Sequence, residues 1–272
     1  MGYWEGKAAV VTGGSSGLGR AIAAALAAAG ARVAIASRGA DALMATAADL
    51  SQGEHEVLAL PADVTRQDDV DRLFGRALDV FGRLDLLANA AGRSMRRAVL
   101  ETTSDDFREL MELNLLGLVR CCRAAAPHLE ASHGHLVNIG SLAGKSAARF
   151  LGAYPATKFA VSAYTQQLRL ELGPNGVHVL LVCPGPIARD AARSESERVA
   201  RGDDLAGLPP SAHLPGAGVR TRVLPPDKLA AAILRACERR KAELVFPASA
   251  RLLFALLQLS PRLGDWIVRQ TT

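Results

Sequence analysis

The chain has 272 residues, of which 49% are hydrophobic and 22% are charged, so it can bury one large core in a single domain. The 32 Lys and Arg residues exceed the 27 Asp and Glu residues, but the net charge of +5 includes no dense basic block, which argues against nucleic-acid binding. The four cysteines lack CxxC and metal-ligand spacing, so we interpret them as reduced thiols and predict no metal site.

The N-terminal residues bear on localisation. They leave no room for the basic and hydrophobic regions of a signal peptide before an apolar run begins at Lys7. Gly6 stands where a myristoylation signal has Ser or Thr. We therefore expect a cytoplasmic protein.

A glycine-rich turn follows the first predicted strand, which runs from Lys7 to Thr12. An alanine-rich segment, 20–29, then predicts a helix that ends at Gly30. A strand, a glycine turn and a helix in this order direct backbone N–H groups and the positive helix end at a phosphate. The turn has its glycines at 13, 17 and 19, and we favour dinucleotide binding over a plain tight connection.

The residues at the end of the second predicted strand, 32–37, bear on the choice of cofactor. Dinucleotide-binding folds that prefer NAD usually have an acidic residue here for the ribose hydroxyls, and this chain has Ser37 and Arg38. The Arg38 guanidinium can pair with a 2'-phosphate, so the sequence favours NADP. The alternative is that Arg38 is a solvated loop residue.

Helices and strands alternate through the next hundred residues. The hydrophobic pattern predicts them over 41–52 (helix), 57–60 (strand), 67–81 (helix), 84–88 (strand) and 135–139 (strand). This alternation predicts an α/β fold of the Rossmann type, with a doubly wound parallel sheet flanked by helices. Asp63 and Asn89 follow two of the strands, at the edge where adenine and nicotinamide-ribose contacts belong, although such residues also form plain turns.

A long amphipathic segment, 104–130, predicts a helix with Asn114 in its middle, and Ser141 follows the next strand. Tyr154 and Lys158 then open another helical segment. Residues four apart share one face of a helix, so the ammonium is expected to lower the pKa of the phenol. Tyr154 then becomes a usable general acid or base.

Four short elements together resemble the short-chain dehydrogenase/reductase family, and the resemblance runs over most of the chain. The segment 12–19 is similar to the family's TGxxxGxG cofactor loop, 89–92 to its NNAG element, and the residues after a predicted strand over 177–183 to its PG turn. With the Arg38 argument, the resemblance implies NADP as the cofactor. The implied cofactor contacts are Gly13, Ser15, Ser16, Gly17, Leu18, Gly19, Ser37, Arg38, Asp63, Val64, Asn89, Ala90, Tyr154, Lys158, Pro184, Gly185 and Ile187.

The fourth element is the family's catalytic tetrad, which Asn114, Ser141, Tyr154 and Lys158 match in order and spacing. The resemblance implies hydride transfer between a nicotinamide and a carbonyl or alcohol carbon, and we expect the substrate to be a small, apolar molecule. Tyr154 is implied to exchange the proton with the substrate oxygen, to which Ser141 donates a hydrogen bond. Lys158 is implied to tune Tyr154 and bind the nicotinamide ribose, and Asn114 to help hold a water in the proton relay.

Two departures from the family pattern are visible. Ala90 replaces the second Asn of the NNAG element, which removes one structural hydrogen bond. Arg189 stands where many members have a Thr that binds the nicotinamide carboxamide, so the anchor of that amide stays open.

The later loops are expected to choose the substrate. The tract 187–224 is first charged and then rich in Pro and Gly, and we interpret it as a lid within a catalytic domain over 1–247; an uninformative surface insertion is the alternative. Three arginines and a serine beside the nicotinamide loop can attract an anionic substrate or simply be solvated: Arg93, Ser94, Arg96 and Arg97.

The C-terminal part begins with a predicted helix over 227–239 and a strand over 243–246 that complete the sheet. An extension, 248–272, follows and includes an apolar stretch over 251–259, too short for the roughly 20 apolar residues that span a bilayer. We favour burial of this extension against protein over peripheral membrane contact through 251–269.

Other functions fit the sequence less well. A dinucleotide-binding regulator or scaffold without activity has no need for a complete tetrad, and an epimerase or dehydratase needs a nucleotide-sugar pocket that the sequence does not identify. An NAD-preferring dehydrogenase is the remaining alternative. The resemblance further implies a homodimer or homotetramer, with a small molecule as the only other partner.

Overall fold

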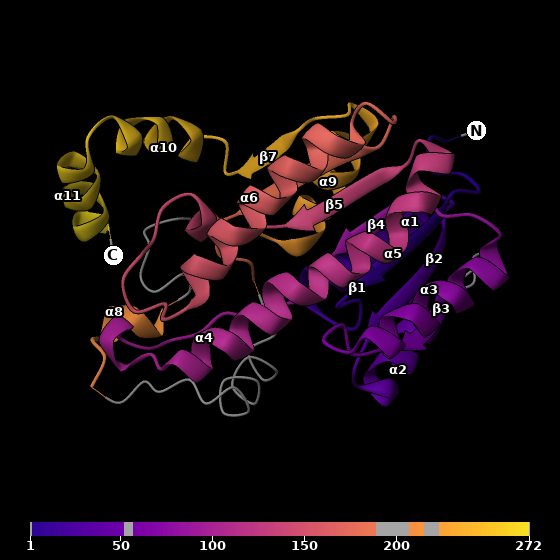
Figure 1. Ribbon diagram of the computed structural model, residues 1–272, viewed down its shortest axis with the longest axis horizontal. Helices are drawn as coiled ribbons and strands as arrows, with labels where there is room; N and C mark the ends of the chain where they lie inside the picture. Colours follow the sequence, from indigo (N-terminus) through magenta and orange to yellow (C-terminus); the bar gives the residue numbers. More distant parts are fainter. Residues whose placement is uncertain (1, 52–56, 189–206, 215–222, 272) are drawn as a thin grey trace.

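The computed structural model describes residues 2–51, 57–188, 207–214 and 223–271. Its centre is a seven-stranded parallel sheet in the order β3-β2-β1-β4-β5-β6-β7 (Figure 1). The strands are β1 (Ala8–Thr12), β2 (Arg32–Ser37), β3 (Val57–Pro61), β4 (Leu86–Asn89), β5 (His135–Ile139), β6 (His178–Pro184) and β7 (Glu243–Phe246). The α/β fold with a doubly wound parallel sheet is therefore confirmed.

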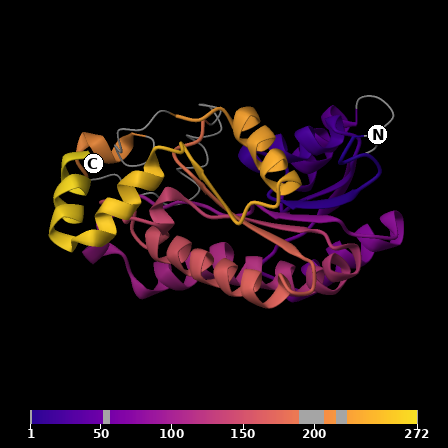
Figure 2. The same cartoon turned by 90° about the horizontal axis from the view of Figure 1, so that it is seen from above.

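Helices cover both faces of the sheet (Figure 2). Within the described ranges they are α1 (Gly17–Ala28), α2 (Ala40–Leu50), α3 (Gln67–Phe81), α4 (Ser104–Met111), α5 (Gly117–Ser132), α6 (Tyr154–Leu172), α8 (Pro210–His213), α9 (Pro226–Glu238), α10 (Ala250–Leu259) and α11 (Pro261–Thr271). Alternate residues of a strand point to opposite faces, so Val11 packs with α1, α2 and α9 while Val10 packs with α3, α5 and α6.

The strand order reverses between β1 and β4. After β3 the chain crosses back over the sheet, so that β2 and β4 lie on opposite sides of β1. The loops that follow β1 and β4 therefore diverge at the carboxyl edge, which is where open α/β sheets bind their ligands. The polar residues predicted at strand ends lie along this edge.

The predicted helix over 104–130 is wrong in one respect, because it is not continuous. It divides into α4, a π-helical turn η2 (Glu112–Leu116) and α5. Asn114 is buried in this turn and bonds to the loop after β4 instead of facing solvent. A single extra residue in a helical turn is common at functional sites, and periodicity does not reveal it.

Two helices follow β7 at the C-terminus. In α10, Ala250 is buried and Phe254 packs against the core cluster beneath α6, while Leu252 is exposed. In α11, Leu263 and Trp266 are exposed. Among the described residues, no helix is both long and apolar enough to cross a bilayer.

Candidate active site

The loop between β1 and α1 is built from glycines that larger residues cannot replace. Gly13 has φ +67°, and a Cβ there would lie 2.9 Å from the backbone nitrogen of Ala91 in the loop after β4. A Cβ on Gly19 would lie 2.2 Å from the carbonyl oxygen of Gly13. These contacts draw the first turn of α1 onto the end of β1.

The first turn of α1 fits an anionic group. Its N-cap residue, Ser16, makes no side-chain capping hydrogen bond, and the turn contains no acidic residue. Gly17 has φ +52°, and no atom lies within 4 Å of the position that a Cβ would take. The backbone N–H groups of a helix N-terminus that lacks a side-chain cap bind phosphate readily, so this turn is suited to a dinucleotide pyrophosphate.

The end of β2 offers a hydroxyl and a guanidinium. The Oγ of Ser37 is buried and has no hydrogen-bond partner among the described residues. Arg38 is exposed and forms no ion pair with any residue of the described ranges. The Arg38 guanidinium is thus available to a ligand at this edge of the sheet, whereas the Ser37 hydroxyl is covered by protein.

The predicted contacts after β3 and β4 differ in their surroundings. The Asp63 carboxylate accepts hydrogen bonds from the backbone nitrogen (3.0 Å) and hydroxyl (2.8 Å) of Thr65, which is the geometry of a turn former. Asn89 is buried, and its Oδ1 has no partner among the described residues. A small crevice beside it is lined by Thr12, Val64, Asn89, Ala91, Gly117, Leu118 and Cys121.

A buried polar network under this crevice escaped the sequence analysis. Asn89 Nδ2 donates to Asn138 Oδ1 at 2.9 Å, and Asn138 Nδ2 donates to Thr165 Oγ1 at 3.1 Å. The network joins β4 to β5 and α6 and fixes the orientation of the Asn89 amide. Asn138 occupies an interior strand position with 0% exposure, and a polar residue inside an apolar strand was the available signal.

Tyr154 and Lys158 lie on one face of the first turns of α6. The Lys158 Nζ lies 5.8 Å from the centroid of the Tyr154 ring and donates to the Ile139 carbonyl at the end of β5, at 2.8 Å. Burial lowers the pKa of Lys158 to about 8, and the nearby Cys183 opposes this shift only in part. The structure thus places the ammonium near the Tyr154 ring, and its effect on the phenol stays a prediction.

Asn114 ties the loop after β4 to α6. Its Oδ1 accepts from the backbone nitrogen of Arg93 at 2.9 Å, and its Nδ2 donates to the carbonyl of Arg93 at 2.9 Å and to Thr157 Oγ1 at 3.0 Å. Thr157 Oγ1 in turn donates to the Tyr154 carbonyl at 2.8 Å. Thr157 was missed from the sequence, although its place three residues after Tyr154 puts it on the same helical turn.

Ser141 follows β5 and caps a short 3-10 turn, η3 (Leu142–Gly144). Its Oγ accepts a hydrogen bond from the backbone nitrogen of Ala143 at 3.1 Å, which leaves the hydroxyl hydrogen available to another acceptor. The Tyr154 side chain packs against two small apolar clusters, one with Met95 and Leu110 and one with Ala143 and Leu151.

Comparison with known proteins identifies the family. A family model described as short chain dehydrogenase matches residues 7–200. The chain belongs to the short-chain dehydrogenase/reductase family. Among its relatives is an uncharacterised oxidoreductase from Staphylococcus aureus strain N315, 39% identical over 195 residues that cover 71% of this chain and 84% of that protein. An L-fucose dehydrogenase from Oryctolagus cuniculus is 40% identical over 188 residues, which are 68% of this chain and 64% of that protein.

Solved structures give the same result. A short-chain dehydrogenase/reductase from Burkholderia phymatum in complex with NAD is 28% identical, with a TM-score of 0.84 over 97% of both chains. One from Mycobacterium ulcerans is 27% identical, with a TM-score of 0.73 over 89% of this chain and 88% of that chain. This short-chain dehydrogenase/reductase is accordingly an oxidoreductase of a family that binds nicotinamide dinucleotides.

The PG turn of this short-chain dehydrogenase/reductase is held by the neighbouring strand. Gly185 N donates to the Phe246 carbonyl at 2.8 Å, and Ala188 N donates to the Leu224 carbonyl at 2.9 Å. The predicted contact residue Ile187 pairs with Leu224 in an isolated bridge. Arg189 and most of the predicted lid, 189–206 and 215–222, lie outside the described residues.

The arginines after β4 face acidic groups of α4. Arg93 pairs with Glu109 at 2.5 Å and Arg97 with Asp106 at 2.5 Å. Arg96 Nε donates to the Ala212 carbonyl in α8 at 3.2 Å. These pairs offset much of the positive charge on which the expected attraction of an anionic substrate depends.

We expect the Gly19→Ala variant to bind a nicotinamide dinucleotide at least about tenfold more weakly, because the new Cβ meets backbone atoms of Gly13 that have no side-chain freedom to move away. Fluorescence titration with NADPH measures the change. The matched control is Gly75→Ala on α3, where no atom lies within 4 Å of the new Cβ and helix propensity gains about 1 kcal/mol. Equal cofactor affinity of Gly19→Ala and the wild type would contradict the close approach of Gly19 to the Gly13 backbone.

Proposed function

We propose that the protein is an NADP-dependent oxidoreductase that interconverts a carbonyl group and an alcohol on a small, apolar molecule, with Tyr154 as general acid and base. The observation that carries this proposal is the Lys158 ammonium, which is buried beside the Tyr154 ring and forms no ion pair with a described carboxylate. A buried cation without a counter-ion costs folding free energy, so the presence of Lys158 at this position favours a catalytic role for it.

The proposed chemistry divides between cofactor and protein. The bound nicotinamide supplies or accepts the hydride. Tyr154 gives its phenolic proton to the substrate oxygen during reduction and takes it back during oxidation, and the adjacent Lys158 cation favours the phenolate. Ser141 directs its free hydroxyl hydrogen at the same oxygen and stabilises the negative charge that develops there.

Asn114 is proposed as a positioning residue. Its side-chain amide donates both of its hydrogens, one to the Arg93 carbonyl and one to Thr157. A water in the proton relay would therefore have to donate a hydrogen bond to an oxygen atom of Asn114. Through Thr157 it fixes the backbone of the turn that carries Tyr154. Its burial supports this role.

The preference for an apolar substrate rests on the surroundings of Tyr154. The two clusters that flank its ring consist of aliphatic and thioether side chains, among them Met95, Ala143 and Leu151. A substrate whose reacting oxygen contacts Tyr154 would place its neighbouring carbons against these groups, which favours apolar over highly hydroxylated molecules. The L-fucose dehydrogenase relative supplies the polar alternative to be tested.

Oxidation of NADPH by a panel of aliphatic and aromatic aldehydes and ketones, with reduction of NADP by alcohols and L-fucose, tests the proposal. We expect turnover of apolar carbonyl compounds at least about tenfold faster in kcat/KM than any sugar reaction, roughly 1.4 kcal/mol of discrimination. A faster reaction with L-fucose would contradict the apolar site. Tight NADPH binding without turnover across the panel would favour the non-catalytic regulator.

Arg38 carries the proposed preference for NADP. Charge-assisted hydrogen bonds contribute about 1.5–3 kcal/mol, so Arg38→Ala is expected to raise the Kd for NADPH by about 10- to 100-fold and to leave the Kd for NADH unchanged. Parallel titrations of both cofactors measure the two constants, with Arg76→Ala on the exposed surface of α3 as the charge-matched control. Equal affinity of the wild type for NADH and NADPH, or tighter binding of NADH, would overturn the assignment. NADH binding is a real alternative, because a structurally similar relative is in complex with NAD.

A further inference from the structure

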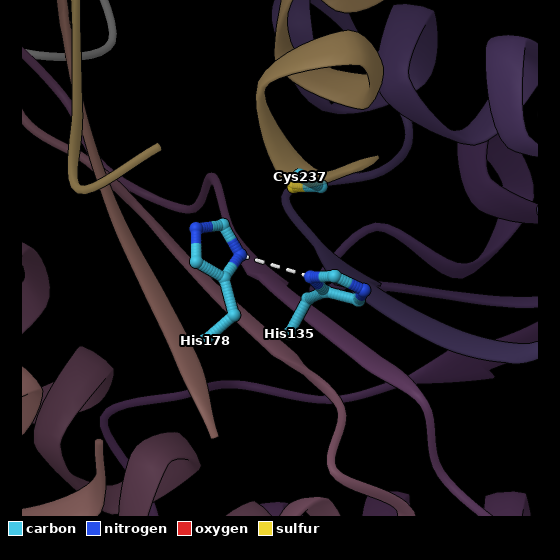
Figure 3. Close-up of side chains that lie close together, drawn as sticks. All are labelled: His135, His178 and Cys237. Carbon is cyan, nitrogen blue, oxygen red and sulfur yellow. Dashed lines mark hydrogen bonds between the residues drawn. The ribbon is translucent and has the colours of Figure 1, made fainter. Parts of the chain in front are cut away.

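Three potential metal ligands meet at the amino edge of the sheet, opposite the candidate active site. His135 and His178 are the first residues of β5 and β6, and they are paired in the sheet register, so their side chains lie side by side on one face. Cys237, near the end of α9, lies above them (Figure 3). At the rise of a β-strand this cluster is about 20 Å from Ser141.

The distances between the ligand atoms are close to those of a metal site. The two Nδ1 atoms are 2.9 Å apart, and one ligand atom from each of the three residues lies within 4.8 Å of the others. Tetrahedral zinc with Zn–N of about 2.0–2.1 Å and Zn–S of about 2.3 Å places its ligand atoms about 3.3–3.6 Å apart. To admit an ion, the two Nδ1 atoms need to separate by a few tenths of an ångström, and the Cys237 sulfur, which lies within 4.8 Å of the histidine ligand atoms, needs to approach them by up to about 1.2 Å.

The outer nitrogens of both rings already have the partners that orient metal-binding histidines. His178 Nε2 lies 2.8 Å from the Lys241 carbonyl, which can only accept, so this nitrogen carries the hydrogen and Nδ1 presents a lone pair. His135 Nε2 lies 2.8 Å from the Tyr3 hydroxyl. A hydroxyl both donates and accepts, so it can serve either tautomer of His135.

We propose that His135, His178 and Cys237 bind a divalent zinc-class cation through Nδ1, Nδ1 and Sγ. Two neutral imidazoles and one thiolate form a borderline-soft set that suits Zn²⁺ or Co²⁺, with water as the fourth ligand. The ion replaces the hydrogen shared by the two rings. That hydrogen moves to His135 Nε2 and is donated to the Tyr3 oxygen, while the Cys237 proton leaves to solvent, so one proton is released per ion.

Charged groups of both signs surround the cluster. Asp85, in the loop before β4, and Glu238, next to Cys237 on α9, favour a cation, whereas Lys7 and Arg240 oppose it. Arg83 also offsets Asp85, with which it forms an ion pair at 2.6 Å. The thiolate supplies the negative charge that decides the balance. A bound ion would join α9 to β5 and β6 and, through Tyr3, to the N-terminal turn, which makes the site structural and independent of the oxidoreductase activity.

Titration of the metal-free full-length protein with Co²⁺ tests this site. We expect saturation at one ion per chain with a thiolate-to-cobalt charge-transfer absorption, displacement by Zn²⁺, and release of one proton. Cys237→Ala should lose the charge-transfer absorption, whereas Cys121→Ala, a buried thiol on α5, should retain it. Absence of the absorption in the wild type, or its persistence in Cys237→Ala, would overturn the proposal.

A second variant leaves the buried cluster intact. Tyr3 is 44% exposed, so Tyr3→Phe removes only the hydroxyl that orients His135 and should fold normally. Loss of such an outer partner typically weakens metal affinity by about 10- to 100-fold, and the same loss is expected here. Zn²⁺ should also raise the Tm of the wild type more than that of Tyr3→Phe. Identical metal affinity and Tm shift in the two proteins would contradict the coordination through Nδ1.

Discussion

The Tyr154→Phe variant is expected to bind NADPH with the affinity of the wild type and to lose at least about a hundredfold in kcat, because a general acid contributes about 10²–10⁴-fold. The substitution removes only the hydroxyl. The ring keeps its packing against Met95 and Leu151, and Thr157 still bonds to the backbone carbonyl of residue 154. The expected loss therefore isolates the proton transfer from the structure of the site.

The same substitution ten residues further along α6 provides the control. Tyr164 is half-buried in the core beneath the sheet, and burial raises the pKa of its phenol to about 12. Tyr164→Phe should retain kcat within about twofold, since its hydroxyl lies away from the proposed proton path. Steady-state kinetics with saturating NADPH compare the two variants, and wild-type turnover by Tyr154→Phe would remove Tyr154 from the mechanism.

The Lys158→Met variant is expected to lose turnover at least about a hundredfold, as for other groups that tune an acid–base residue, and to make the cofactor-free protein more stable. The stability gain follows from the buried ammonium, whose pKa falls from 10.5 to about 8. Each pKa unit corresponds to about 1.4 kcal/mol, and the loss of the bond to the Ile139 carbonyl offsets about 1 kcal/mol. A net increase of about 2 kcal/mol in the free energy of unfolding is expected at pH 7.

The pH dependence separates this cause from simple repacking. Between pH 8 and 10.5, Lys158 keeps its proton in the unfolded chain but loses it in the folded protein. The unfolded state then binds more protons, so the free energy of unfolding rises with pH in the wild type and lacks this contribution in the variant. The advantage of Lys158→Met is therefore greatest below pH 8 and declines towards pH 10.5.

Urea unfolding at several pH values measures this difference, with the exposed Lys228→Met on α9 as the matched control. The control should change stability by no more than about 0.5 kcal/mol at any pH. A Lys158→Met protein that is less stable than the wild type at pH 7 would show that the ammonium stabilises the fold, and its catalytic interpretation would lose its main support.

The sequence by itself determined the sheet and the identities of the residues at its carboxyl edge. Buried parallel strands are short apolar runs, so the strands over 32–37, 135–139 and 243–246 were predicted with the bounds that the structure has. Tyr154 and Lys158 could be paired because a helix fixes the relation of residues four apart. The relative placement of two residues within one regular helix follows from their spacing along the chain, so it can be predicted from the sequence.

Tertiary structure alone decided how separate elements meet. The π-helical turn that buries Asn114, and the chain from Asn114 through Thr157 to the Tyr154 backbone, depend on the loop after β4 approaching α6. The cysteine spacing gives no sign that Cys237 lies beside His135 and His178. The register of β5 and β6 aligns the two histidines, which are 43 positions apart, and the packing of α9 brings Cys237 to them. Such contacts arise from packing across the sheet, and no periodicity along the chain encodes them.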